Sequence, residues 1–311
     1  MNVVNEKYLG DFLEYLTLER SMANNSIEAY RNDIEKLCYY VEEFLGARNL
    51  ETITMDELSG FLEWTAKMGL SPRTQARILS AVKNFYIYLL TENIVAESPA
   101  YLLTTPKLEM ALPTVLSVEE IDMIEGAIDL SSYEGERNRA IIETLYSCGL
   151  RVSELINLKV SDIFPDQGFI KVTGKGDKTR LVPISESALK YINFYIEKMR
   201  CHMAINSENK DYLFLNRRGR KLTRVMIFTI VKRLCDKAEI GKTVSPHTFR
   251  HSFATHLVEG GADLRAVQEM LGHESIQTTE IYTHLDSQYL RDAIMSHHPR
   301  SDRKLINFND Y

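Results

Sequence analysis

Histidines gather toward the end of this 311-residue chain. Five of the eight, His247, His251, His256, His273 and His284, lie within 38 residues of one another. Histidine can ligate a metal ion, move a proton near neutral pH, or hydrogen-bond an anion. The cluster therefore favours either a metal site or a metal-free site that acts on an anionic group.

The segment 247–260, "HTFRHSFATHLVEG", predicts a helix with two different faces. At 100° per residue, Arg250 shares one face with His247 and His251. An arginine is costly to bury without a partner, and its fork of donors suits phosphate. We expect this face to line an anion site, with a plain solvated surface as the alternative. The opposite face is expected in the core and carries Phe249, Phe253 and Leu257.

A metal site is not favoured, although His247 and His251 have the spacing of two ligands on one helix. The zinc-protease helix needs Glu after the first His, and Thr248 stands there. No Asp/Glu cluster lies nearby to hold Mg²⁺ for a two-metal reaction. The sequence predicts a cationic site with no metal and no cofactor.

Such a site suits attack on a phosphodiester by a protein side chain, for which Tyr282 is the candidate nucleophile. Guanidinium groups can neutralise the non-bridging oxygens, and histidines can move protons. A free phenol with a pKa near 10 is only about one part in a thousand ionised at pH 7, a deficit of roughly 4 kcal/mol. Neighbouring cations and a histidine can supply much of that. Packing in the core is the alternative for one of sixteen tyrosines.

The elements that position these residues are mostly helical. Apolar residues recur at helical spacing in four segments of the first hundred residues, which predicts a helical bundle over 1–106. Pro99, Pro106 and Pro113 interrupt the periodicity, so residues 107–112 are predicted to be a linker. The four segments are 8–19, 26–45, 54–68 and 71–90.

The second part, 113–300, is expected to be mainly α with one small antiparallel sheet. Residues 117–128 and 136–149 have helical spacing, and "RVSELINL" begins another helix. The period changes in 168–184, "GFIKVTGKGDKTRLVPI", where two short β-rich runs flank a Gly-containing turn, which predicts a hairpin. Helical spacing then returns nearly to the end, and residues 301–311 form a tail.

The net charge of −6 argues at first against a nucleic-acid partner. Residues 1–106 account for all of it, with nine Lys and Arg against fifteen Asp and Glu. Two basic clusters, 171–180 and 216–224, lie in the electrically balanced remainder. The four scattered cysteines predict free thiols in a reducing compartment. With no long apolar run and an acidic start, we expect a cytoplasmic protein without a membrane segment.

Four motifs, in order, resemble the tyrosine recombinase (phage integrase) family, and within it the Xer branch. The resemblance extends to about Arg300, some 95% of the chain. The motifs are "YSCGLRVSELINLKVSDI", "VTGKGDKTRLVPI", the segment 245–284 beginning "SPHTFRHSFATH", and the late "HHPR".

The resemblance implies a role for each matched residue. Two arginines would clamp the scissile phosphate, a lysine would protonate the 5′-oxygen leaving group, and two histidines would bind the phosphate and shuttle protons. A tyrosine would form a 3′-phosphotyrosyl intermediate, and a glutamate would support the site. These are Arg151 and Arg250, Lys175, His247 and His273, Tyr282, and Glu154, respectively; His251 and His284 are left as supporting or structural.

The resemblance also implies the partners. A SAM-like core-binding domain and the catalytic domain would clasp a double-stranded DNA recombination site. The last helix, within 287–298, would dock on a neighbour in a tetramer on two sites, and a short amphipathic core helix is the alternative for it. The neighbour would be a second copy or a second Xer-type recombinase, and a septal DNA translocase is a further expected partner. Residues expected to contact DNA are Arg73, Arg77, Lys83, Arg217, Arg218, Arg220 and Lys221.

The function expected from the resemblance is resolution of chromosome dimers at cell division. Three alternatives remain at this point: an integrase or invertase of a mobile element or phase-variable locus, a DNA-binding module on the same fold without chemistry, and a metal-dependent nuclease. The last lacks ligands, and the module is disfavoured because all six matched catalytic positions hold the expected residue types.

Overall fold

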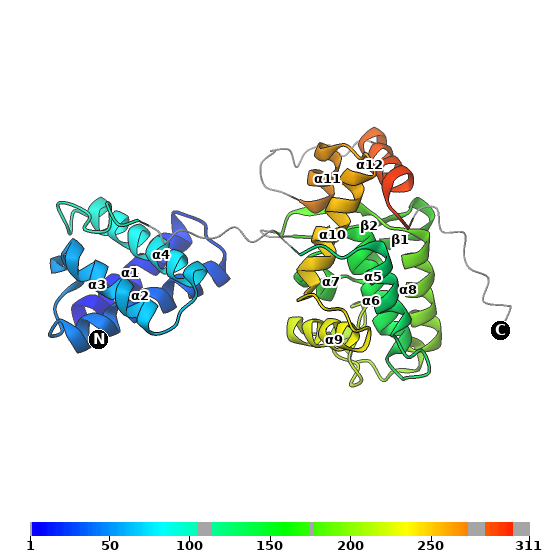
Figure 1. Cartoon of the computed structure of the whole chain (residues 1–311), viewed down its shortest axis with the longest axis horizontal. Helices are drawn as coiled ribbons and strands as arrows, with labels where there is room; N and C mark the ends of the chain where they lie inside the picture. Colours follow the sequence, from blue (N-terminus) through cyan, green and yellow to red (C-terminus); the bar gives the residue numbers. More distant parts are fainter. Residues whose placement is uncertain (1, 105–113, 175–176, 273–283, 301–311) are drawn as a thin grey trace. The chain divides into compact units, whose positions relative to one another are not determined.

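The computed structural model describes residues 2–104, 114–174, 177–272 and 284–300 (Figure 1). The chain divides into two compact units, residues 1–111 and 112–311, and each is described by itself. The predicted linker at 107–112 and the tail at 301–311 lie outside the described residues. Within the described ranges, no helix is both long enough and apolar enough to cross a bilayer.

The first unit is a bundle of helices, as its apolar periodicity predicts. Helix α4 packs against the other three, and Phe12, Phe61 and Phe85 are fully buried in the shared core. Thr54 caps its helix in a capping box, which the Thr-x-x-Glu spacing at that point encodes. The elements are α1 (Val3–Leu18), α2 (Asn24–Phe44), the 3₁₀ turn η1 (Leu50–Thr52), α3 (Met55–Lys67) and α4 (Pro72–Thr91).

The second unit is mostly helical with one small sheet, which confirms the predicted fold class. Helix α6 lies between α8 and α10 and is buried along almost its whole length (Figure 1). Its helices are α5 (Val118–Gly126), α6 (Gly135–Cys148), α7 (Val152–Asn157), α8 (Glu186–Lys198), α9 (Arg224–Lys237), α10 (Pro246–Glu259), α11 (Leu264–Leu271) and α12 (His284–His297), with 3₁₀ turns at Val160–Asp162, Pro165–Gln167, Arg200–His202 and Ser207–Asn209.

The sheet has the antiparallel order β1-β2-β3, formed by Ile163–Phe164, Phe169–Thr173 and Thr179–Pro183. The hairpin between β2 and β3 was predicted from the change of period. Val172 pairs with Arg180 in the register, and Arg180 is buried together with Val182 two residues later. Because side chains alternate along a strand, Arg180 points to the same side as the apolar residues of the core.

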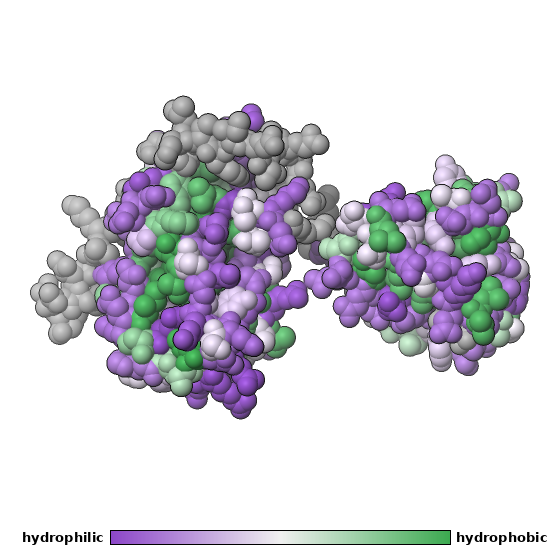
Figure 2. Space-filling model, turned by 180° about the vertical axis from the view of Figure 1, so that it is seen from behind, coloured by the Kyte–Doolittle hydropathy of each residue, from purple (hydrophilic) through white to green (hydrophobic). Residues whose placement is uncertain are grey.

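Polar residues cover most of the face shown in Figure 2, with apolar residues in smaller patches on each unit. Large side chains such as Ile141, Leu145 and Tyr146 of α6 are fully buried instead. Burial of apolar surface is the main driving force for folding. Each unit therefore has its own hydrophobic core.

Gly149 ends α6 in a left-handed conformation with φ +58°, and the chain turns there toward α7. A Cβ at this position would overlap the ring of Phe253, which is fully buried. We predict that Gly149→Ala lowers the free energy of unfolding by about 2 kcal/mol or more, the sum of left-handed strain and overpacking.

Urea unfolding at pH 7 checks this prediction, with Gly126→Ala as the matched control. Gly126 is the last residue of α5 and has no heavy atom within 4 Å of an added Cβ, so Ala there is expected to stabilise by about 0.5 to 1 kcal/mol. Equal stability of the two variants would contradict the account of this turn.

Candidate active site

Arg151 and Glu154 stand at the start of α7, directly after the Gly149 turn. The backbone N–H of Arg151 donates to Glu154 Oε2 at 2.8 Å, and its Nη1 donates to Oε1 at 2.9 Å. Glu154 is buried, whereas the Arg151 side chain is 36% exposed. The i, i+3 spacing of the two residues thus anchors one side of the Arg151 guanidinium, and the side chain stays partly exposed to a ligand.

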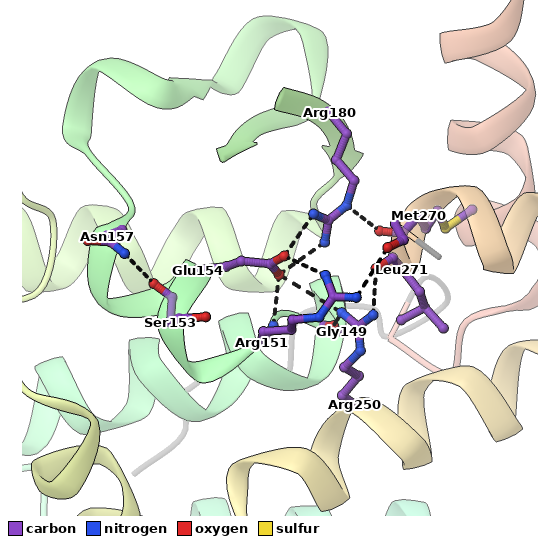
Figure 3. Close-up of polar contacts among 10 residues, drawn as sticks. Gly149, Arg151, Ser153, Glu154, Asn157, Arg180, Arg250, Met270 and Leu271 are labelled. Carbon is purple, nitrogen blue, oxygen red and sulfur yellow. Dashed lines mark hydrogen bonds and ion pairs between the residues drawn. The ribbon is translucent and has the colours of Figure 1, made fainter. Parts of the chain in front are cut away.

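Arg180 reaches the same carboxylate from strand β3 (Figure 3). Its Nη1 and Nη2 donate to Glu154 Oε1 and Oε2 at 2.8 and 3.0 Å, a bidentate pair. Its Nε donates to the carbonyl of Met270 at 2.8 Å. No role is expected for this buried arginine from the four motifs.

Arg250 enters from α10 and is buried as well. Its Nη1 donates to the carbonyl of Gly149 at 2.8 Å, and its Nη2 donates to the carbonyl of Leu271. Glu154 Oε2 lies 3.9 Å from Nη1. We name Arg151, Arg180, Arg250 and Glu154 together the arginine cluster.

The last turn of α11 closes the cluster with three consecutive carbonyls. Met270, Leu271 and Gly272 accept hydrogen bonds from Arg180, Arg250 and Arg151 respectively, the last at 3.1 Å. The C-terminal end of a helix carries partial negative charge, which favours cations. Gly272 caps α11 with φ +64°, in the left-handed region that favours glycine. The sequence therefore ends α11 where its free carbonyls meet the guanidinium groups.

The arginine cluster has three positive charges against one carboxylate. Burial alone would raise the pKa of Glu154, but the hydrogen bonds and charge of Arg180, and then Arg151, lower it below its ordinary value. Burial and the charge of Arg151 lower the pKa of Arg250 to about 10, so it stays protonated at neutral pH. The cluster thus carries a net positive charge and can bind an anion such as a phosphodiester.

His247 lies on the first turn of α10, three residues before Arg250, and is exposed. Desolvation of the part of the ring that neighbouring residues cover, and then the charges of Arg250, His251 and Arg151, lower its pKa. Its imidazole is therefore neutral at pH 7 and can accept a proton or a hydrogen bond.

Comparison with known protein families identifies the family that has this site. Residues 114–289 match the model described as the phage integrase family, and residues 9–93 match the phage integrase N-terminal SAM-like domain. The chain belongs to the phage integrase family. The resemblance seen in the four motifs is thereby confirmed, and so is the SAM-like bundle at the N-terminus.

Individual relatives cover nearly the whole chain. Tyrosine recombinase XerD of Oceanobacillus iheyensis is 40% identical over 296 residues, which is 95% of this chain and 99% of the relative. Tyrosine recombinase XerD of Staphylococcus haemolyticus is also 40% identical, with 95% and 100% coverage.

Two solved structures are similar to this chain over most of its length. The XerH site-specific recombinase bound to its difH substrate before cleavage matches with a TM-score of 0.65 and 28% identity, over 92% of this chain and 94% of that one. A lambda integrase dimer bound to a core site has a TM-score of 0.68 over 87% and 95%, and its 18% identity shows a shared fold.

The structure brings three of the predicted family residues, Arg151, Glu154 and Arg250, into direct contact, with His247 beside them on α10. Lys175, His273 and Tyr282 lie outside the described residues. Within the parts of the chain that the structure describes, no group of three or more His, Cys, Asp or Glu side chains could hold a metal ion.

The predicted DNA contacts of the SAM-like domain lie on α4 and have different surroundings. Arg73 is exposed near the start of the helix. Arg77 forms an ion pair with the buried carboxylate of Asp33, and Lys83 donates to the carbonyl of Tyr101 at 3.4 Å. Arg73 is therefore the best placed of the three to meet a phosphate, and the role of all three stays a prediction.

The second basic cluster lies on the loop before α9. Arg218 and Arg220 are exposed, and Arg217 is exposed but forms an ion pair with Glu134. Lys221 lies over the ring of Tyr212, with its Nζ 4.5 Å from the ring centroid. Exposed arginines on a loop can contact phosphates without reading bases, and DNA binding by these residues also stays a prediction.

Replacing Glu154 tests the charge balance of the arginine cluster. We predict that Glu154→Gln lowers the free energy of unfolding at pH 7 by about 1.5 to 3 kcal/mol, because hydrogen bonds to charged groups are lost. The pKa of Glu154 is lower in the folded chain than in the unfolded chain, where it is near 4.3. Ionised Glu154 therefore stabilises the folded state fully above the unfolded pKa, and this stabilisation is lost as the pH falls through the folded pKa. The wild-type chain should therefore lose more stability than Glu154→Gln on acidification.

Urea titrations between pH 3 and pH 7 measure this difference. Glu259→Gln serves as the control, because Glu259 is exposed at the end of α10. A pH dependence of Glu154→Gln identical to that of the wild type would contradict the ionised state assigned to this carboxyl.

Proposed function

We propose that this site-specific tyrosine recombinase uses Tyr282 to attack a phosphodiester held by the arginine cluster. The observation that carries the proposal is the pair Arg151 and Arg250. Within the described residues the side chain of each donates two hydrogen bonds, and a guanidinium has five N–H donors, so each retains donors that can serve phosphate oxygens. Family membership supplies the reaction class.

The chemistry is an in-line displacement at phosphorus. The phenolic oxygen of Tyr282 forms a bond to phosphorus while the bond to the 5′-oxygen breaks, leaving a 3′-phosphotyrosyl ester. A neutral histidine, His247 or His273, accepts the phenol proton, and Lys175 gives a proton to the departing 5′-oxygen. Arg151 and Arg250 stabilise the charge that develops on the non-bridging oxygens.

Rejoining reverses the same steps. A 5′-hydroxyl attacks the phosphotyrosyl ester, the tyrosine oxygen leaves and regains its proton, and a phosphodiester forms again. The energy of the original bond is kept in the ester, so neither ATP nor a cofactor is required.

The proposed biological role is that of XerD, resolution of chromosome dimers at cell division. The similarity to proteins named tyrosine recombinase XerD over nearly their full length supports this role. The proposed partners are a double-stranded recombination site and three further recombinase subunits, either copies of this chain or a second Xer-type recombinase. A septal DNA translocase completes the proposed set. The DNA-bound recombinase structures that share the fold support the DNA partner.

Covalent capture tests the proposed reaction. Duplexes selected by the protein from a random-sequence library are nicked close to the exchanged phosphate, so that the short fragment carrying the 5′-hydroxyl diffuses away and the ester accumulates. In EDTA, the wild-type chain is expected to form an adduct that survives denaturing electrophoresis. An adduct that required added Mg²⁺ would exclude the mechanism proposed.

A further inference from the structure

We propose that Arg180 is a positioning residue for strand cleavage. It fixes Glu154 and the last turn of α11, and through Glu154 it fixes the guanidinium group of Arg151. This inference rests on the proposed function, because it assigns a task within that same site.

The contacts of Arg180 point into the protein. All three of its guanidinium nitrogens donate to protein acceptors: two to the Glu154 carboxylate and one to the carbonyl of Met270. Only 8% of the side chain is exposed, against 36% for Arg151. Arg180 therefore links β3, α7 and α11 through hydrogen bonds, whereas the Arg151 side chain is partly exposed and can contact a ligand.

Two glycines pack beside Arg180, and each directly precedes a predicted catalytic position. A Cβ on Gly272 would lie 3.2 Å from the Cδ, Nε and Cζ atoms of Arg180. A Cβ on Gly174 would lie 3.7 Å from its Nη1 and 3.8 Å from Glu154 Oε1. The next residues in the chain are His273 and Lys175. The Arg180 guanidinium thus lies against both glycines.

The charge of Arg180 explains why this residue should affect strand cleavage. Glu154 Oε1 accepts from both Arg151 and Arg180, and Oε2 accepts from Arg180 and the backbone of Arg151. Without Arg180, the buried carboxylate would keep Arg151 as its close cation, with Arg250 at 3.9 Å. It would then draw these two guanidinium groups toward itself and away from the phosphate.

Cleavage should depend on Arg180 far more than DNA affinity does. Affinity for DNA is spread over many phosphate contacts, whereas displacement at phosphorus needs the clamp within a fraction of an ångström. The full-length Arg180→Met variant is expected to form adduct about 10²-fold more slowly at saturating protein in EDTA, with a Kd for the same nicked duplex within about threefold of wild type. Arg180→Lys should recover part of the rate, since it restores the charge without the bidentate geometry.

Arg137→Met is the matched control. Arg137 is another buried arginine of the same unit. Among the described residues its polar partners are the carbonyl of Leu215 and the side chains of Asn138 and Glu134, none of which belongs to the arginine cluster. Its loss should lower stability and leave the cleavage rate of folded protein within about threefold of wild type. The double variant Arg180→Met, Glu154→Gln removes the buried carboxylate that has lost its bidentate partner, so it should recover stability relative to Arg180→Met and still cleave slowly.

The measured rates and affinities distinguish a positioning role of Arg180 from a general effect on stability and from DNA binding. A wild-type cleavage rate in Arg180→Met overturns the inference, and so does an equal slowing in Arg137→Met, which would mean that rate follows general stability. A fall in affinity as large as the fall in rate would make Arg180 a DNA-binding residue instead. Absence of adduct with the wild-type chain would overturn the proposed function first, and this inference with it.

Discussion

Tyr282→Phe is expected to abolish the covalent adduct that the wild-type chain forms with a nicked duplex. The substitution removes one oxygen, and with it the atom that bonds to phosphorus. Loss of a nucleophile that works with fixed partners lowers a rate by about 10⁴-fold or more. Adduct formation should therefore fall below detection in a single-turnover assay read on denaturing gels.

DNA binding is expected to survive this substitution, because the phosphate is held by the cations of the arginine cluster and not by the phenol. The measured Kd for the nicked duplex should stay within about threefold of the wild type. Tyr133→Phe is the matched control, since Tyr133 is an exposed tyrosine of the same unit, 52% accessible. Persistent adduct in Tyr282→Phe would assign the nucleophile to another side chain, and loss of adduct in Tyr133→Phe would make the assay unspecific.

The orientation of helix α10 could be predicted from the sequence. Its spacing predicted Phe249, Phe253 and Leu257 on the core side, and all three are fully buried. The expectation that Arg250 needs a polar partner is also confirmed, since two carbonyls and a carboxylate surround it. Periodicity is informative here because packing of the aromatic residues decides the rotation of the helix.

Arg180 was missed, although the sequence carries a signal for it. In "TRLVP" it stands two residues before Val182, so a strand places both side chains on the same face. An arginine at a core-facing position requires a buried anion, and Glu154 is available in the preceding motif. The number of charges in the basic cluster 171–180 does not show on which face of the strand each side chain lies.

The hydrogen-bond acceptors at the end of α11 had no such signal in the sequence. The acceptors on α11 are the backbone carbonyls of Met270, Leu271 and Gly272, which every residue type possesses. Only the fold brings the end of this helix to the guanidinium groups, since the contacts span from 21 to 121 residues of sequence. The motifs identify Arg151 and Arg250, but the groups that orient these two side chains are set by the fold.

Arg250→Lys is expected to slow adduct formation by about 10² to 10³-fold, because one preorganised donor to the developing charge is lost. Lysine keeps the charge but offers a single ammonium on a flexible stem. It cannot span the carbonyls of Gly149 and Leu271, which Arg250 bridges with its two terminal nitrogens. The clamp on the phosphate would thus become mobile even though the net charge of the site is unchanged.

A matched substitution separates this geometric effect from a general loss of guanidinium groups. Arg265 on α11 is 70% exposed and pairs with Glu269 at 3.6 Å, so Arg265→Lys should leave both the cleavage rate and the affinity within about twofold of wild type. Single-turnover rates at saturating protein, measured with Kd on the same nicked duplex, compare the two variants. Full activity in Arg250→Lys would mean that charge alone suffices at this position, and the bridging of the two carbonyls would then serve folding and not the clamp.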